Sequence, residues 1–243
     1  DLISNTPNLN FIEIENGVCT LGAGTTATDL IESDIFCSAI PRLKKHLKLV
    51  ASSPIRNMAT IGGNFVNASP IGDFTAFFLA LNAKVKLIIK GQNRTIYLKD
   101  FYKGYKDLDK SPDEIVSTIS FKLPTQDNHF NFEKVSKRIH LDIASVNTAI
   151  QLTVSENKIT QAHLSAGGVG PIPMYLGKSC DFLMDKVLSP ETVQSGNEII
   201  QTEINPISDV RGSADYKRLL LRQLFYAHFI TLFPNQFTLD SLK

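Results

Sequence analysis

The sequence is most informative over residues 56–73, which read RNMATIGGNFVNASPIGD. Two adjacent glycines, Gly62 and Gly63, lack the Cβ atom that keeps a ligand away from the backbone. Their N–H groups suit phosphate oxygens or the polar edge of a heterocycle. Further hydrogen-bonding groups in this stretch are the side chains of Thr60, Asn64 and Asn67. This combination predicts a segment that lies against a polar ligand.

A carboxylate closes the same stretch. Asp73 follows Asn64 by nine residues, beyond a turn that contains Pro70, and its oxygens are suited to accept hydrogen bonds from sugar hydroxyls. The residue types also leave a second interpretation open: a tight surface turn in which Asn and Ser side chains satisfy local backbone groups. A pair of glycines alone is weak evidence for a nucleotide site.

The elements on either side of this stretch predict sheets covered by helices. Residues 10–14 and 18–21 read as a hairpin around Asn16-Gly17, and residues 84–90 and 94–98 as another. A helix is expected after Thr25 or Thr26, a second over residues 40–50, and a third over residues 74–81 with Asp73 as a candidate cap. Pro54 is expected to end the second helix, and residues 115–123 to form a strand.

The second half of the chain has a different character. Polar residues 125–131 read as a linker, and strands are expected over residues 132–136, 146–154 and 158–166. Helices are expected over residues 190–200 and 216–232. We therefore predict an α+β fold in two domains, residues 1–127 and 128–243, in which antiparallel hairpins dominate.

Composition excludes several classes of protein. With 25 basic and 24 acidic residues the chain lacks the basic face of a nucleic-acid binder. Its apolar runs are too short to span a bilayer. Three widely spaced cysteines and scattered histidines give no pattern for a zinc or iron–sulfur site, so no metal ligand is assigned. Sparse, unpaired cysteines fit reduced thiols and lead us to expect a cytoplasmic protein.

The order of residues in the 56–73 stretch resembles a known motif. R-N-x-A-T-I-G-G-N followed by A-S-P-x-x-D is similar to the second flavin-binding motif of the medium-subunit family of xanthine and carbon monoxide dehydrogenases. The resemblance continues along nearly the whole chain. It is carried by residues 21–25 (LGAGT), 81–85 (LNAKV), 100–105 (DFYKGY), 113–116 (DEIV) and 209–218 (DVRGSADYKR).

The resemblance implies that the cofactor is FAD and assigns roles to eight residues. Gly62, Gly63 and Asn64 would wrap its diphosphate and ribityl region. The hydroxyls and the edge of the adenosine or ribityl part would be held by Thr60, Asn67 and Asp73.

Two further residues would lie near the isoalloxazine ring. Lys134 would stabilise negative charge on the reduced flavin, and Val116 would pack against the ring. The residue types alone equally allow Lys134 to be a solvated strand lysine and favour Val116 as a core valine.

The resemblance also points to a segment that this sequence does not contain. Members of the family carry an earlier Gly-rich loop that cradles the FAD pyrophosphate, and residues 2–9 here resemble the segment that follows it. We expect a chain without that loop to bind FAD poorly, because half of a two-sided grip contributes less than half of the affinity.

The function implied is electron transfer. The chain would carry FAD and relay electrons from [2Fe–2S] clusters and molybdopterin on partner chains or domains to NAD or another acceptor. No side chain of this chain would act on the organic substrate. Two alternatives are a stand-alone flavin oxidoreductase and a flavin-free scaffold that docks the other subunits.

Overall fold

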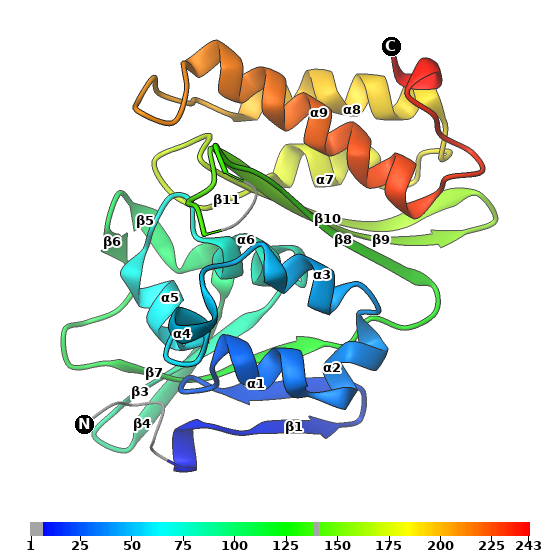
Figure 1. Ribbon diagram of the computed structural model, residues 1–243. Coiled ribbons are helices and arrows are strands. Elements are labelled where there is room, and N and C mark those ends of the chain that lie inside the picture. The colour runs from blue at the N-terminus through cyan, green and yellow to red at the C-terminus, as the bar shows by residue number, and fades with distance from the viewer. Residues whose placement is uncertain (1–6, 139–140) are drawn as a thin grey trace.

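Two antiparallel sheets alternate with two layers of helices in the computed structural model, which describes residues 7–138 and 141–243 (Figure 1). The lower sheet is covered by α1–α6, and the upper sheet lies above α6 with α7–α9 on its outer face. The predicted α+β class is confirmed. Residues 2–5, which resemble the segment after the pyrophosphate loop, lie outside the described residues.

The lower sheet has five strands in the order β1-β2-β7-β3-β4. Both predicted hairpins are present, and Asn16 and Gly17 take the positive φ angles (50° and 76°) that a tight turn needs. Strand β7 comes from later in the chain and inserts between the two hairpins. The strands are β1 (Ile12–Glu15), β2 (Val18–Gly22), β3 (Lys84–Ile89), β4 (Gln92–Tyr97) and β7 (Ile115–Lys122).

Six short helices form the layer between the sheets. They are α1 (Ala27–Glu32), α2 (Asp34–Ala39), α3 (Leu43–Lys48), α4 (Ser53–Arg56), α5 (Ile61–Asn67) and α6 (Asp73–Ala80). Thr26 caps α1 as predicted. Three expectations were wrong. The helix expected over residues 40–50 is reduced to α3, because Pro41 separates it from α2. Pro54 lies in the first turn of α4 instead of breaking a helix, since proline suits that position. Asp73 is the first residue of α6, and Gly72 occupies the cap position.

Helix α6 lies in the middle of the molecule. Every residue from Phe74 to Ala80 is buried, as expected for a helix that is apolar on all sides. Its Phe77 ring lies 4.6 Å, between centroids, from the ring of Phe130 in the upper sheet. Because Phe130 and Phe132 belong to the same hydrophobic core as α6, the two halves of the chain are joined through buried apolar contacts.

The upper sheet has four strands in the order β11-β10-β9-β8. Strand β8 begins at Asn128, paired with Thr153, so part of the segment expected to be a linker is strand. Pairing with β9 overrides the polar composition there. The strands are β8 (Asn128–Val135), β9 (Val146–Ser155), β10 (Lys158–Gly167) and β11 (Met174–Tyr175). A small separate hairpin is formed by β5 (Tyr102–Gly104) and β6 (Asp107–Leu108).

Three helices cover the outer face of the upper sheet. They are α7 (Gly177–Leu183), which the sequence did not predict, α8 (Pro190–Glu203) and α9 (Ala214–Leu232). Leu221, Phe225 and Phe229 of α9 enter a second hydrophobic core beneath them. Within the described ranges no helix has the length and hydropathy that a bilayer crossing requires.

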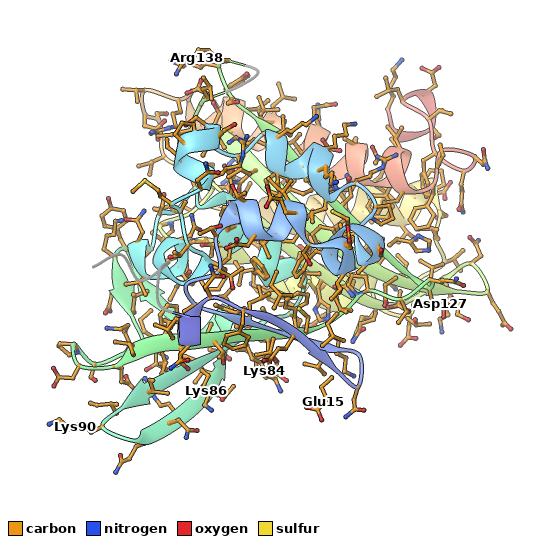
Figure 2. All side chains as sticks on the ribbon, turned by 60° about the horizontal axis from the view of Figure 1, so that its bottom comes forward. Glu15, Lys84, Lys86, Lys90, Asp127 and Arg138 are labelled. Atoms are coloured by element: carbon orange, nitrogen blue, oxygen red, sulfur yellow. The ribbon has the colours of Figure 1, made fainter. Side chains whose placement is uncertain are left out.

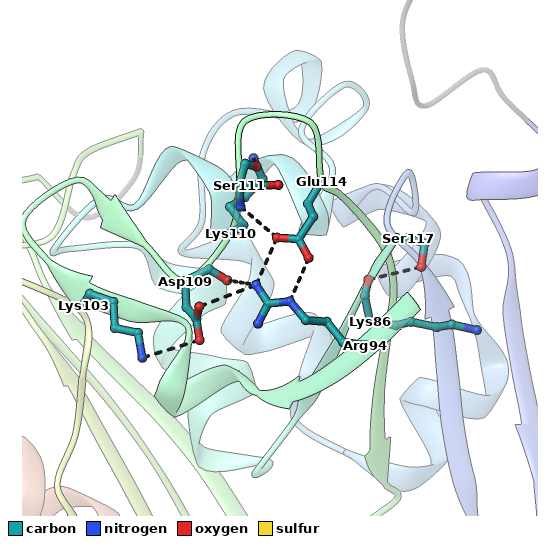
Figure 3. A network of polar contacts seen from close by, with 8 residues as sticks. All are labelled: Lys86, Arg94, Lys103, Asp109, Lys110, Ser111, Glu114 and Ser117. Atoms are coloured by element: carbon teal, nitrogen blue, oxygen red, sulfur yellow. Dashed lines mark hydrogen bonds and ion pairs between the residues drawn. The ribbon is translucent and has the colours of Figure 1, made fainter. Parts of the chain in front are cut away.

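Arg94 of β4 holds the loop of residues 109–114, which precedes β7, at one end of the lower sheet (Figure 3). Its Nε and Nη2 donate to the two oxygens of Glu114 at 2.7 and 3.0 Å, and Nη2 also donates to the carbonyl of Asp109 at 2.7 Å. The amide of Ser111 donates to Glu114 at 2.7 Å. The bond from Arg94, followed by that from Ser111, lowers the pKa of Glu114 to about 2. This network is structural, and no sequence motif indicated it.

Candidate functional site

The fold brings two glycine-containing segments together. The amide of Ile61 donates to the carbonyl of Thr25 at 2.9 Å, and the amide of Gly62 donates to the carbonyl of Ala23 at 3.0 Å. Thr26 and Thr60 form a β-bridge beside them. The turn after β2 and the start of α5 therefore form one surface, although each was noticed separately in the sequence.

The first turn of α5 uses its own backbone amides. The Thr60 hydroxyl accepts from the amide of Gly63 at 3.0 Å, and the Thr60 carbonyl accepts from the amide of Asn64 at 3.0 Å. With Ile61 and Gly62 bound to the β2 turn, four consecutive N–H groups are engaged within the protein. The sequence had suggested that these amides would face a ligand. Capping and docking of the helix occupy them instead, so side chains are left as the donors of this segment.

The two glycines make different contributions. A Cβ atom on Gly62 would lie 2.7 Å from the Cβ of Ala23, so this glycine allows α5 to pack directly on the β2 turn. Gly63 is exposed, and a Cβ there would meet one neighbour, the Thr60 hydroxyl at 2.7 Å. The absent side chain of Gly63 leaves the backbone of α5 open to close approach. That open surface fits an elongated cofactor such as FAD.

Two asparagines of α5 border this surface. Asn64 is half-buried, and its Oδ1 accepts from the hydroxyl of Thr75 on α6 at 3.1 Å. This bond orients the amide, whose NH2 group has no partner among the described residues. Asn67 is exposed, and its carbonyl contacts the ammonium of Lys106. The chain leaves the helix at Ala68, which takes a left-handed conformation with φ of 48°.

A buried ion pair lies at the N-terminal end of α6. The Lys134 ammonium on β8 donates to Asp73 Oδ2 at 2.7 Å and to the carbonyl of Leu49 at 2.9 Å, and its side chain is 2% exposed. Asn147 of β9 donates to the other carboxylate oxygen at 2.6 Å. Burial raises the pKa of Asp73, while Lys134 and Asn147 oppose that effect by stabilising the charged form.

The buried ion pair excludes one interpretation of Lys134 and adds Asn147 to the residues of interest. Lys134 is not a solvated strand lysine, because its ammonium is enclosed between the two halves of the chain. Asn147 was not predicted. The available signal was an amide next to Val146 at the start of the strand expected over residues 146–154, and the first seven residues of β9 are buried. A buried amide in such a strand requires a polar partner.

Val116 is placed in the core. It is 8% exposed, pairs with Leu87 across the lower sheet, and lies on the strand against which α5 packs. This position is the one that burial statistics favoured. Among the eight residues singled out in the sequence, Gly63 and Asn64 bond to Thr60 at the start of α5, and Gly62 bonds to the β2 turn. Asn64 also connects to α6 through Thr75, and Asp73 is joined to Lys134.

Comparison with known families identifies the class. Residues 2–125 match the family model described as the FAD binding domain in molybdopterin dehydrogenase, and residues 131–232 match the CO dehydrogenase flavoprotein C-terminal domain. The first match alone covers more than half of the 243 residues. The chain belongs to the family of FAD-binding subunits of molybdenum-dependent dehydrogenases.

Individual relatives agree with this assignment. The glyceraldehyde dehydrogenase medium chain of Sulfolobus acidocaldarius is 29% identical over 222 residues, covering 91% of this chain and 78% of the relative. The carbon monoxide dehydrogenase medium chain of Hydrogenophaga pseudoflava is 27% identical over 224 residues, covering 91% and 77%. A solved structure of carbon monoxide dehydrogenase from Hydrogenophaga pseudoflava superposes with a TM-score of 0.89 at 25% identity, covering 95% of this chain and 80% of the other.

Proposed function

We propose that this chain is the FAD-carrying electron-transfer component of a molybdenum hydroxylase, in which it relays electrons from iron–sulfur clusters to NAD or another acceptor. The iron–sulfur clusters and molybdopterin would lie on partner subunits or domains. The observation that carries the proposal is the open surface at Gly63, where the β2 turn and α5 meet beside two asparagines. A bound flavin supplies the redox chemistry, including hydride transfer.

The residues of α5 would bind the cofactor through side chains. The hydroxyl of Thr60 and the amides of Asn64 and Asn67 are suited to hydrogen-bond phosphate oxygens and sugar hydroxyls. Gly62 supports them by letting α5 pack on the β2 turn, and Gly63 keeps the surface open. The backbone amides of residues 61–64 are already hydrogen-bonded within the protein. We therefore expect FAD affinity to depend mainly on the side chains of this segment.

Asp73 and Lys134 would set the charge beside the site. The carboxylate of Asp73 holds the ammonium of Lys134 in place, and the pair is buried where water screens it weakly. The ammonium end of this pair, held in a fixed orientation by Asp73, would favour negative charge on a reduced flavin. A contact of Val116 with the ring is also part of the proposal, although its burial with Leu87 supports a core role more directly.

The test is a visible absorption spectrum of the full-length protein, with released cofactor identified by mass. We expect flavin bands and FAD. Asn64→Ala should reduce the FAD content, whereas Val66→Ala, a change at an exposed position of the same helix, should leave it unchanged. Equal loss in both variants would show that α5 is required for folding only and would remove its assignment as the site.

Other outcomes distinguish the alternatives. A colourless protein that takes up no FAD would refute the flavin proposal, and if it still assembled with the other subunits it would be a docking scaffold. A yellow protein that turns over a substrate without partner subunits would be a stand-alone flavin oxidoreductase. Reduction of the flavin by a partner's iron–sulfur clusters, followed by reoxidation with NAD, would support the relay.

A further inference from the structure

A cleft with walls from both sheets lies past the C-terminal end of α6. It has a volume of about 290 Å³ and is lined by both sheets and by the turn at Leu81 and Asn82. The lower sheet contributes two cross-strand pairs, Lys84 with Ser120 and Val18 with Lys122. The cleft is therefore assembled from segments that are distant in sequence.

The upper sheet supplies neutral polar groups. Gln151 and His163 are cross-strand partners on β9 and β10, and both line the cleft together with Gln161. His163 Nδ1 contacts the hydroxyl of Tyr175 at 2.7 Å. Burial, followed by the nearby Lys99, lowers the pKa of His163 to about 4, so its ring is neutral at pH 7.

Gln151 points to a missing partner. The residue is 8% exposed, and its Oε1 atom has no hydrogen-bond partner among the described residues. Buried polar atoms are nearly always satisfied, and an orphaned amide oxygen calls for a donor, such as a bound water or a hydroxyl or N–H group of a small organic molecule that carries the phosphate. An amide at the wall of a polar cleft is therefore a second sign that the cleft holds something.

The charge of the cleft has one sign. Its lining contains Lys84 and Lys122 and no acidic residue. A third ammonium is close by: Lys99 lies 5.4 Å from the centroid of the Tyr97 ring, and Lys84 lies 4.9 Å from the same centroid. Contacts with an aromatic ring position an ammonium without neutralising it. Within residues 7–138 and 141–243, none of these three lysines forms an ion pair.

We propose that this cleft binds a phosphate group, either free or carried on a small organic molecule. Several compact ammonium charges with neutral amide and hydroxyl groups suit the oxygens of a phosphate dianion. A cleft lined by charge of one sign concentrates the opposite ion. The volume of about 290 Å³ leaves room for a phosphate and a ring.

The cleft is separate from the surface at Gly63, and the proposal does not rest on the proposed function. Asp73 is the first residue of α6, and the cleft begins at Leu81, just after the last residue of the same helix. The eight residues of α6, a length of about 12 Å, therefore separate Asp73 from the cleft. Figure 2 labels Lys84 and Lys86, which lie two residues apart on β3 of the lower sheet.

The test is isothermal titration calorimetry of the full-length protein with inorganic phosphate, adenosine 5′-monophosphate and adenosine, at constant ionic strength. We expect saturable binding of one phosphate ligand per chain and no binding of adenosine. Equal affinities for the two phosphates would identify free phosphate as the ligand, and tighter binding of the nucleotide would identify a carried phosphate. Absence of saturable binding by either would overturn the proposal.

Charge variants locate the site. Lys84→Gln and Lys122→Gln should each weaken binding about tenfold, because each removes a charged hydrogen bond. Lys86→Gln is the matched control: it lies two residues from Lys84 on the same strand and does not line the cleft, so its effect should stay below about twofold. If all three variants lose the same affinity for phosphate while their circular dichroism spectra stay unchanged, the anion is attracted by the general positive charge of the surface. That result would overturn the assignment of the site to this cleft.

Discussion

Replacing Asp73 with Asn should destabilise the protein more than a typical surface change. The Lys134 ammonium is 2% exposed and has two acceptors, Asp73 at 2.7 Å and the carbonyl of Leu49 at 2.9 Å. Asp73→Asn keeps the size of the side chain and removes its charge. The lysine is then left in a buried position with a carbonyl and an amide in place of a carboxylate.

The magnitude follows from the burial of the pair. Removing one partner of a buried ion pair costs about 3–5 kcal/mol, because the remaining charge is uncompensated. For a chain of this length, 1 kcal/mol corresponds to roughly 2–4 °C in Tm. We therefore expect Tm to fall by about 10 °C. Since domains are stable by about 5–15 kcal/mol, the variant should still fold at room temperature.

The assay is urea and thermal unfolding of the wild type, Asp73→Asn, Lys134→Met and the double variant. The double variant should be more stable than Asp73→Asn, because it removes the uncompensated charge. Asp209→Asn is a matched control: its partner Lys217 is also 2% exposed at 2.8 Å, but Asp209 is 29% exposed against 12% for Asp73. Its effect should be smaller, since water screens the site. A loss below about 1 kcal/mol for Asp73→Asn would refute the reasoning.

Three further predictions concern stability. Burial lowers the pKa of His228 to about 3. Between about pH 6.5 and pH 3 the unfolded imidazole therefore binds more protons than the folded one, and stability should fall by about 1.4 kcal/mol for each pH unit in that window. The fall in urea midpoint from pH 7 to pH 5 should be smaller for His228→Gln than for the wild type. Gly62→Ala should cost about 1–3 kcal/mol by overpacking, whereas Gly104→Ala, with its nearest neighbour at 3.7 Å, should unfold at nearly the wild-type temperature. Glu114→Gln should lower Tm at pH 7 by breaking the contact with Arg94, and the difference should shrink as pH falls from about 4.5 toward 2, where the wild-type carboxylate is protonated.

Local patterns were sufficient for much of the secondary structure. The Asn16-Gly17 turn, the Thr26 cap and the apolar run that became α6 each depend on residues within a few positions of one another. Such short-range signals are governed by backbone sterics and local hydrogen bonds. The expectations that were wrong concerned the limits of elements. Strand β8 extends into a polar segment because its partner β9 is there to pair with it.

In the candidate site, too, the sequence predicted some features and only the tertiary structure decided others. Residue types and their order in the 56–73 stretch, with the resemblance they carry, pointed to FAD and to Gly63 and Asn64. They did not show that the amides of this stretch are consumed by the Thr60 cap and the β2 turn. Nor did they show Asn147, because its importance depends on burial next to Asp73.

The sequence by itself determined the class of this protein: an α+β, FAD-binding subunit of a molybdenum-dependent dehydrogenase, recognisable from short motifs in a fixed order. Only the tertiary structure decided which groups face each other. It enclosed the Lys134 ammonium against Asp73, packed Gly62 onto Ala23, and formed a lysine-containing cleft with walls from both sheets. The physical reason is that burial, desolvation and charge pairing depend on distances in space, and these distances join residues that the chain keeps far apart.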